Sequence, residues 1–438
     1  MPLHPNKEGT SMITLLAAMP LVAILMLMVG FRWSGSKAGV AGWLTALIIA
    51  AIGFKTGFNV LLWAQISGLF RAANVLYIIW GALFFFRVTE ADGTLDATSN
   101  LLQQLTPSRV LQVLLLAWGF TSFLQGVGGF GVPVAVVAPI LVTMGFPALQ
   151  AVVMASVGHA WAISFGSLGA SYEALISATG LLGTEIGPWM AVFLGLVCFL
   201  VGIAVLWIAG GKRMVRQGWW QLSSMGAAMA ITQYAAARVG LGNIAAMLGA
   251  LAGIITGTVW ARAQASNRLK KNPIADIEKP SVNFRDGLRK MAPYGILLII
   301  IFTVNFIIPL KTVLNDITFQ VNIPELVLAD QSRIPAAKTQ SISLFGHPGA
   351  LLVYAGALTF LLAIKQGTLP PGSREKIRKG VLRSGLKSSL GILAMMAMAT
   401  TMQSAGMVAQ LSSNMASISG NLYPLVAPFI GALGAFMT

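Results

Sequence analysis

Long apolar runs separated by short polar segments recur along the whole chain. Most runs approach about 20 residues, the length that an α-helix needs to cross a hydrocarbon core of roughly 30 Å. Run 58–70 is short and run 222–239 is rich in alanine and polar residues, so either could instead lie at the membrane interface. The pattern predicts about 12–13 membrane-spanning segments, at residues 13–30, 38–54, 58–70, 73–88, 111–143 (a broken element), 148–170, 188–209, 222–239, 241–260, 291–310, 348–364, 386–408 and from 421 onward.

Composition supports the same fold class. Of the 438 residues, 56% are apolar and 10% are charged, which would leave a soluble domain with too little polar surface. We therefore predict an all-α polytopic protein of the cell membrane, with the lipid bilayer as its solvent. The single cysteine, Cys198, lies in an apolar run, so an internal disulfide and a cysteine metal cluster are excluded, and we expect no metal and no cofactor.

The net charge of +16 raises the question of a nucleic-acid partner. The basic residues, however, gather in short loops beside apolar runs, at residues 212–216, 262–290 and 365–387. This is the positive-inside pattern, in which lysine and arginine mark the cytoplasmic loops of a membrane protein. We therefore expect no nucleic-acid partner, and we place these three segments on the cytoplasmic side.

The most informative stretch is GVGGFGVPVAVVAP, at residues 126–139, where four glycines and two prolines interrupt an apolar run. Glycine costs about 1 kcal/mol and proline about 3 kcal/mol in a helix interior, so the run resists a continuous helix. At membrane depth a broken helix persists only where protein or a watery cavity satisfies its backbone groups. Val132 and Pro133 would open a new half-helix, whose free N–H groups and positive dipole end favour a carboxylate. The alternative is a close helix contact through small residues.

Polar side chains flank this break. Ser122, Gln125 and Ser164 can each hydrogen-bond a carboxylate or a hydroxyl, or can instead satisfy freed backbone groups. His159 is the only histidine well inside a predicted span, and no clearly apolar span holds an acid, so His159 is the candidate for proton coupling; the alternative is a neutral histidine bonded to the helix backbone. Arg71 could pair with a carboxylate or snorkel to the headgroups. The expected substrate-binding residues are Ser122, Gln125, Gly126, Gly128, Gly129, Phe130, Gly131 and Ser164.

A faint internal repeat relates the two halves of the chain. Residues 121–128 read TSFLQGVG and residues 399–406 read ATTMQSAG, with glutamine and glycine at matching places. Inverted repeats with a broken helix in each half are a common plan of secondary transporters. We expect a first transmembrane repeat over residues 1–215, with the break at 126–133, and a second over 216–438 that is incomplete at its C-terminus.

Three segments carry a family resemblance: TEADGTLDATSNLLQQLTPSRVLQ at residues 89–112, SFLQGVGGFGVPVAVVAPILVTMGF at 122–146 and SFGSLG at 164–169. In order and spacing they resemble the L-lactate permease family, closely in the first half of the chain and more loosely in the second. The resemblance implies uptake of L-lactate, D-lactate or glycolate by proton symport.

The chain departs from the pattern of this family at three places. Gln125 stands where members have a glutamate, and HAWA at residues 159–162 replaces a sequence like Asn-Thr-Ala-Pro. Losing the acid puts the proton coupling of the family in doubt, while His159 offers a substitute proton carrier or indicates a different substrate. The segment that would supply the second broken element is absent after GALGAFMT at 431–438, so we expect a truncated chain or a divergent short member.

Other classes of function fit less well. A membrane-embedded enzyme would need a nucleophile with a base, or a metal set, and one cysteine, one histidine and no acid within the spans do not supply them. No GxxxxGK[ST] loop is present for ATP hydrolysis, and the polar segments are too short for the soluble domain of a receptor. The nearest alternative is the same fold carrying another organic anion, coupled to sodium, or an inactive truncated member. The sequence leaves the oligomeric state open.

Overall fold

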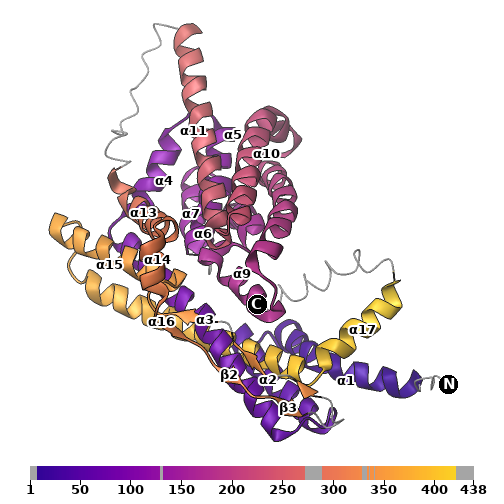
Figure 1. The fold of residues 1–438 in the computed structure, drawn as a ribbon. Coiled ribbons are helices and arrows are strands. Elements are labelled where there is room, and N and C mark those ends of the chain that lie inside the picture. The colour runs from indigo at the N-terminus through magenta and orange to yellow at the C-terminus, as the bar shows by residue number, and fades with distance from the viewer. Residues whose placement is uncertain are drawn as a thin grey trace. The chain divides into compact units, whose positions relative to one another are not determined.

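A computed structural model describes residues 7–128, 132–271, 289–327, 333–334, 336–339 and 341–420. Nearly all regular structure in these residues is helical (Figure 1), so the predicted all-α fold class is confirmed. Contacts divide the chain into two units: unit 1 comprises Met1–Leu76, Thr318–Ile342 and Leu382–Thr438, and unit 2 comprises Tyr77–Ile317 and Ser343–Val381. Two long helices, α3 (Phe58–Ala91) and α16 (Ser373–Ser404), belong partly to each unit.

Unit 1 is built on a core of small and flexible apolar side chains, among them Ala17, Ile24, Ala46 and Met398. Helix α1 packs on α2 and α17. Short strands pair in order β1 with β6, β2 with β5 and β3 with β4, inside a segment that the sequence analysis treated as a loop. The elements are α1 (Lys7–Leu25), the π-helix η1 (Met26–Gly30), α2 (Gly35–Ile52), α17 (Met407–Ser419), β1 (Thr318–Phe319), β2 (Asn322–Ile323), β3 (Leu326–Val327), β4 (Arg333–Ile334), β5 (Ala337–Lys338) and β6 (Ile342–Ser343).

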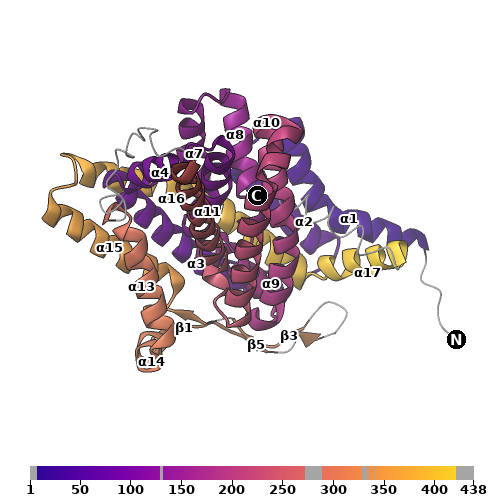
Figure 2. The same ribbon diagram turned by 90° about the horizontal axis from the view of Figure 1, so that it is seen from above.

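Unit 2 holds the largest buried side chains, including Trp118, Trp161 and Phe120. Helices α10 and α11 pack along one another, and α11 packs on α6 (Figures 1 and 2). Its elements are α4 (Thr94–Gln104), α5 (Arg109–Val113), the π-helix η2 (Leu114–Phe120), α6 (Thr121–Val127), α7 (Val132–Thr143), α8 (Ala148–Gly158), the 3-10 turn η3 (Ala160–Ala162), α9 (Gly166–Thr179), α10 (Gly183–Arg238), the 3-10 turn η4 (Gly242–Ile244), α11 (Ala245–Lys271), α13 (Ala292–Phe306), α14 (Ile308–Asn315) and α15 (Pro348–Gln366).

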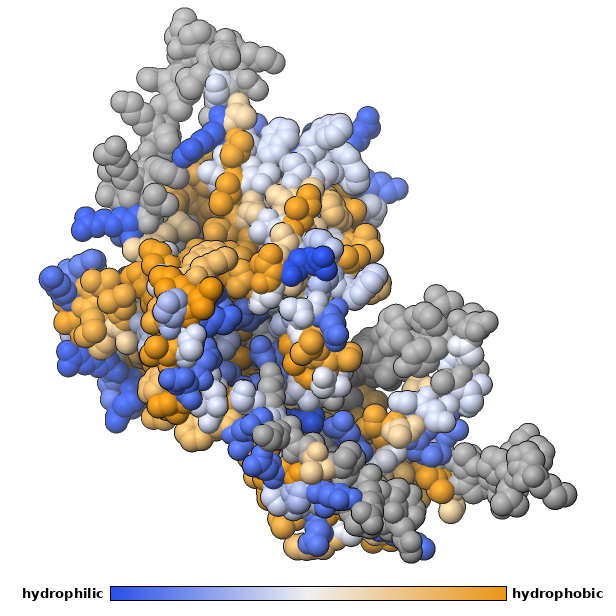
Figure 3. Space-filling view, in the orientation of Figure 1, coloured by the Kyte–Doolittle hydropathy of each residue, from blue (hydrophilic) through white to orange (hydrophobic). Residues whose placement is uncertain are grey.

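The described residues contain 8 helices long and apolar enough to cross a membrane, or up to 10 if each bent pair counts as one span. Large apolar side chains such as Ile52, Phe58 and Trp189 are exposed on their outer faces, and Figure 3 shows extensive hydrophobic surface. Such surface suits lipid rather than water. The protein is thus a multi-pass membrane protein; the span predicted from residue 421 lies outside the described residues.

The predicted end of one span at residue 70 and the predicted start of the next at residue 73 were both wrong. Runs 58–70 and 73–88, expected as separate spans, form the single helix α3. The residues that join them, Phe70, Arg71, Ala72 and Ala73, include no proline or glycine, so nothing in the local sequence ends the helix.

Other predicted spans are bent. The segment expected as one span at 148–170 bends by 50° where η3, which follows α8, meets α9. The segment at 291–310 turns by 90° between α13 and α14. Helix α10 contains a kink at Gly210 and Gly211, where Gly211 has φ +65°, a value that glycine adopts at low cost. The kink separates the predicted spans 188–209 and 222–239.

A reciprocal glycine contact sets the approach of α3 and α15 within unit 2. A Cβ at Gly349 would lie 2.5 Å from the Tyr77 carbonyl oxygen, and a Cβ at Gly81 would lie 2.5 Å from the Gly349 carbonyl oxygen. We therefore expect Gly349→Ala to lower the free energy of unfolding by about 1–3 kcal/mol, because the backbones must separate. Thermal unfolding of the purified protein in detergent measures this effect.

Gly295→Ala is the matched control, because a Cβ at Gly295 meets nothing within 4 Å. This substitution removes a glycine from a helix and is expected to be neutral or stabilising, by up to about 1 kcal/mol. Equal unfolding temperatures for the two variants would contradict the close contact.

Candidate functional site

The helix before the predicted break is buried over its second and larger part. Elements α5, η2 and α6 run on from Arg109 to Val127, and every residue from Leu114 to Val127 is buried. The central turn is a π-helix, a rare geometry that often occurs at functional sites. Polar side chains on α6 therefore face protein, and their hydrogen-bonding groups must find partners there.

Ser122 is the centre of a buried hydrogen-bond network. Its hydroxyl lies 2.6 Å from the Trp118 carbonyl oxygen and 3.1 Å from that of Gly158, and it accepts a hydrogen bond of 2.8 Å from the Trp161 indole. A single hydroxyl proton serves these two carbonyl acceptors in turn. Ser122 thus ties α6 to the end of α8 and to η3.

Gly158 allows this attachment, since α8 and the π-helical turn meet there without side chains between them. A Cβ at Gly158 would collide with the Ala117 carbonyl oxygen and lie 3.0 Å from the Thr121 hydroxyl oxygen. That hydroxyl donates to Ala117 at 2.7 Å. The network holds the start of α6 in one position against α8.

Gln125 lies one turn beyond Ser122, at the end of α6. Its side chain is 8% exposed, and a Cβ at Gly166 would lie 2.7 Å from its amide nitrogen. The amide carries both donor and acceptor groups that can serve a ligand at the break.

The glycines of the break have different roles. Gly126 allows close packing, since a Cβ there would lie 2.7 Å from the backbone of Met247 in α11. Gly128 ends α6 with an N–H bond of 2.8 Å to Leu124, and a Cβ at Gly128 would meet nothing closer than 3.7 Å. The described part of α7 comprises Val132–Thr143 and includes Pro133. Gly129, Phe130 and Gly131 lie outside the described residues.

A left-handed turn faces the end of α6. Ser167 (φ 50°), Leu168 (φ 49°) and Gly169 (φ 78°) all have positive φ. Positive φ costs about 1–3 kcal/mol at residues other than glycine and clusters at functional sites. A Cβ at Gly169 would lie 2.5 Å from Asn243, so the neighbouring η4 holds the turn. Ser164 lies just before it, half-buried, in the bend between η3 and α9.

His159 ends α8 beside this network. Its Nδ1 lies 2.7 Å from the Ala155 carbonyl oxygen. A carbonyl only accepts, so Nδ1 carries a proton and Nε2 is left as the acceptor of the neutral ring. His159 is therefore bonded to the helix backbone through one nitrogen, while the other stays available for a proton.

Arg71 is part of unit 1, apart from the unit that contains the other candidates. Its guanidinium lies 3.4 Å from the Gln403 side-chain oxygen, a long hydrogen bond. Gln403 is the residue that the internal repeat aligns with Gln125. The structure thus joins Arg71 to the second repeat motif and leaves its predicted pairing with a carboxylate untested.

Gln233 in α10 is a polar residue that sequence reasoning missed. It is 0% exposed, and neither its amide oxygen nor its amide nitrogen has a hydrogen-bond partner within the described ranges. A Cβ at Gly249 would lie 3.3 Å from both Gln233 Cβ and the Trp161 ring. A buried amide without partners costs about 1–3 kcal/mol. The only sequence signal was an unexpected polar residue inside run 222–239.

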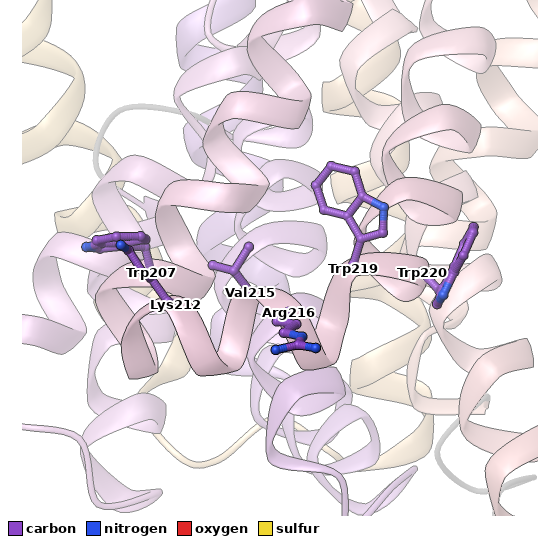
Figure 4. Close-up of a pocket in the computed structure, with 6 residues that line it drawn as sticks. All are labelled: Trp207, Lys212, Val215, Arg216, Trp219 and Trp220. Carbon is purple, nitrogen blue, oxygen red and sulfur yellow. The ribbon is translucent and has the colours of Figure 1, made fainter.

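A hollow lies at the kink of α10 (Figure 4). It has a volume of about 410 Å³ and is lined by Trp207, Lys212, Val215, Arg216, Trp219 and Trp220. Trp207 is 51% exposed and lies beside Lys212, whose Nζ is 6.0 Å from its ring centroid. Exposed tryptophans beside basic residues are typical of the membrane–water interface. These residues therefore suit a turn at the membrane–water interface, and none of them belongs to the break.

No group of three or more histidine, cysteine, aspartate or glutamate side chains in the described part of the chain is placed to hold a metal ion. The candidate site at the break consists of amide, hydroxyl, imidazole and backbone groups. Such groups can bind a small anion by hydrogen bonds.

Comparison with known proteins gives consistent matches. The family model for L-lactate permease matches residues 13–438. An L-lactate permease of Streptococcus iniae is 24% identical over 426 residues, covering 97% of this chain and 86% of the relative. An L-lactate permease of Bacillus subtilis and the glycolate permease GlcA of Escherichia coli are each 24% identical, covering 98% of this chain and 81% of each relative.

No solved structure matches the chain. The family match, however, extends over far more than the three segments that carry the sequence resemblance, and it includes both units. The chain belongs to the L-lactate permease family, a family of the cell membrane.

Proposed function

We propose that this protein is a secondary active transporter of small 2-hydroxymonocarboxylates, namely L-lactate, D-lactate and glycolate, by proton symport. Membership in a permease family indicates a transporter rather than an enzyme. Relatives of which the chain covers more than four fifths are an L-lactate permease and a glycolate permease. The observation that carries the proposal is the buried amide of Gln125 at the end of α6, where the helix breaks inside the protein.

The substrate carboxylate binds at this break. The Gln125 amide N–H₂ donates to one carboxylate oxygen, and the first N–H groups of α7, with the positive end of its dipole, stabilise the negative charge. Ser164 and the left-handed turn at Ser167 contact the 2-hydroxyl group. Ser122 acts indirectly, because its hydrogen bonds hold α6 in position.

His159 carries the coupled proton. Nδ1 stays bonded to Ala155, and Nε2 takes up the proton when the anion arrives. The positive imidazolium and the negative carboxylate then form a neutral pair while the site changes the side of the membrane to which it is open. The pair therefore exposes no net charge to the low dielectric of the membrane. A glutamine at position 125, in place of an acid, suits this arrangement because it does not repel the substrate.

Two repeats, residues 1–215 and 216–438, move against one another, so that the site is open to one side of the membrane at a time. A helix break in each half supports this proposal: α16 ends after Gln403, and Gly406 (φ +80°) donates its N–H to the Gln403 carbonyl at 3.2 Å before α17 begins.

Uptake of labelled L-lactate into proteoliposomes tests the transport proposal. An inward proton gradient should drive accumulation, and a protonophore should abolish it. Accumulation that requires a sodium gradient would replace proton symport with sodium coupling. No uptake of L-lactate, D-lactate or glycolate under either gradient would overturn the proposal and direct attention to other organic anions.

His159→Gln tests the coupling role. Glutamine cannot carry a proton, so we expect loss of gradient-driven accumulation while exchange of internal for external lactate continues. His347→Asn is the matched control: burial lowers the pKa of His347 to about 4, so that side chain stays neutral between about pH 5 and 8, the range in which histidines usually titrate. Accumulation retained by His159→Gln, with an unchanged pH profile, would exclude His159 as the proton carrier.

Gln125→Leu tests the carboxylate contact. A hydrogen bond to a charged group contributes about 1.5–3 kcal/mol, so we expect the KM for lactate to rise about 10-fold or more, with less effect on maximal rate. Gln217→Leu on the exposed surface of α10 is the matched control and should leave the KM unchanged. An unaltered KM in Gln125→Leu would remove Gln125 from the site.

A further inference from the structure

A cavity of unit 2 lies where α13 begins and where α3 and α15 end. Its volume is about 710 Å³. Arg289 and Lys290 line one side, Gln366 and Thr368 another, and the apolar Ile296 and Leu362 continue the wall. Nothing in the proposed transport mechanism uses these residues.

The mouth of the cavity is suited to an anion. Arg289 and Lys290 immediately precede α13, a helix of 15 residues whose positive dipole end faces the same space. No described residue forms an ion pair with either side chain. Asp92 also lines the cavity, and its carboxylate accepts hydrogen bonds from the hydroxyls of Thr368 and Thr94. Asp92 keeps its negative charge in these hydrogen bonds, so the described lining holds two basic groups against one acid and carries a net positive charge.

A second, independent feature is the hydroxyl of Thr359 in α15. Thr359 is 2% exposed and lines the cavity, and its oxygen has no hydrogen-bond partner among the described residues. Helical threonines usually donate to the carbonyl four residues earlier, as Thr256 and Thr258 do here at 2.8 Å. A buried hydroxyl without that bond indicates that a ligand supplies its partner.

The depth of the cavity indicates a long ligand. Thr359 precedes the last residue of α15, Gln366, by seven positions, so its hydroxyl lies about 10 Å below the helix end. The cavity extends along α15 from Gln366 to Thr359, and a lactate-sized anion would fill a small part of its volume. On the same two helices Ile299 and Leu361 are 67% and 62% exposed, as expected of lipid-facing side chains.

We propose that this cavity binds the headgroup of an anionic phospholipid from the cytoplasmic leaflet. The phosphate lies between Arg289, Lys290 and the start of α13; the glycerol region reaches the Thr359 hydroxyl, which donates to an ester carbonyl. The acyl chains follow Ile296 and Leu362 outward. Basic pockets between helices on the cytoplasmic side recognise such headgroups, and the positive-inside pattern places residues 262–290 and 365–387 on that side.

Native mass spectrometry of the full chain in detergent tests this site, with phosphatidylglycerol and phosphatidylcholine added in equal amounts. We expect wild type to retain phosphatidylglycerol preferentially. The pair Arg289→Gln/Lys290→Gln should lose most of the preference, since each basic group near the membrane surface is worth roughly a fivefold change in binding. Thr359→Val should weaken retention and Thr359→Ser should restore it.

The control pair Arg374→Gln/Lys376→Gln removes the same charge from exposed positions of α16 that do not line the cavity, and should behave as wild type. An equal loss in both pairs would show general surface attraction and overturn the site. Displacement of the lipid by inorganic phosphate or by L-lactate would show a small-anion site instead. Far-UV circular dichroism confirms that each variant is folded, and retention unchanged by Thr359→Val and by the Arg289 and Lys290 pair would also overturn the proposal.

Discussion

Every backbone N–H and C=O inside a membrane must be bonded within the protein, and the candidate site depends on this constraint. The chain leaves regular α-helical geometry at the π-turn before α6, at the end of α6 and in the left-handed turn at Ser167 and Leu168. All three irregular segments are buried among α8, α10 and α11. Protein contacts, and the Ser122 network in particular, replace the hydrogen bonds that lipid cannot supply.

Glycine serves two opposite purposes around this site. Gly126 and Gly158 lie where backbones touch, so their lack of a side chain allows close packing. Gly128 has space around it and ends a helix. The sequence offered two interpretations of these glycines, a close helix contact and the end of a helix. Gly126 fits the first and Gly128 fits the second, although they are only two residues apart.

Charged groups and neutral polar groups occupy different places in the chain. The described residues of the break supply the Gln125 amide, hydroxyl groups and the ring of His159, while arginine and lysine gather at helix ends and at the kink of α10. The same ends form the hollow with exposed tryptophans at the kink of α10 and the cavity at the start of α13. The candidate site at the break and the basic clusters thus lie in different parts of the protein.

The sequence alone determined the membrane class and the end of α6 near Gly128, because apolar length and glycine act locally. Tertiary structure decided the rest. The bend after α8, the positive φ at Leu168 and the complete burial of Gln233 depend on neighbours distant in the chain, such as Gly249 and Asn243. The pattern of apolar residues in the sequence shows how apolar a segment is. The packing of other helices determines which face of the segment is buried and where strained backbone conformations are held in place.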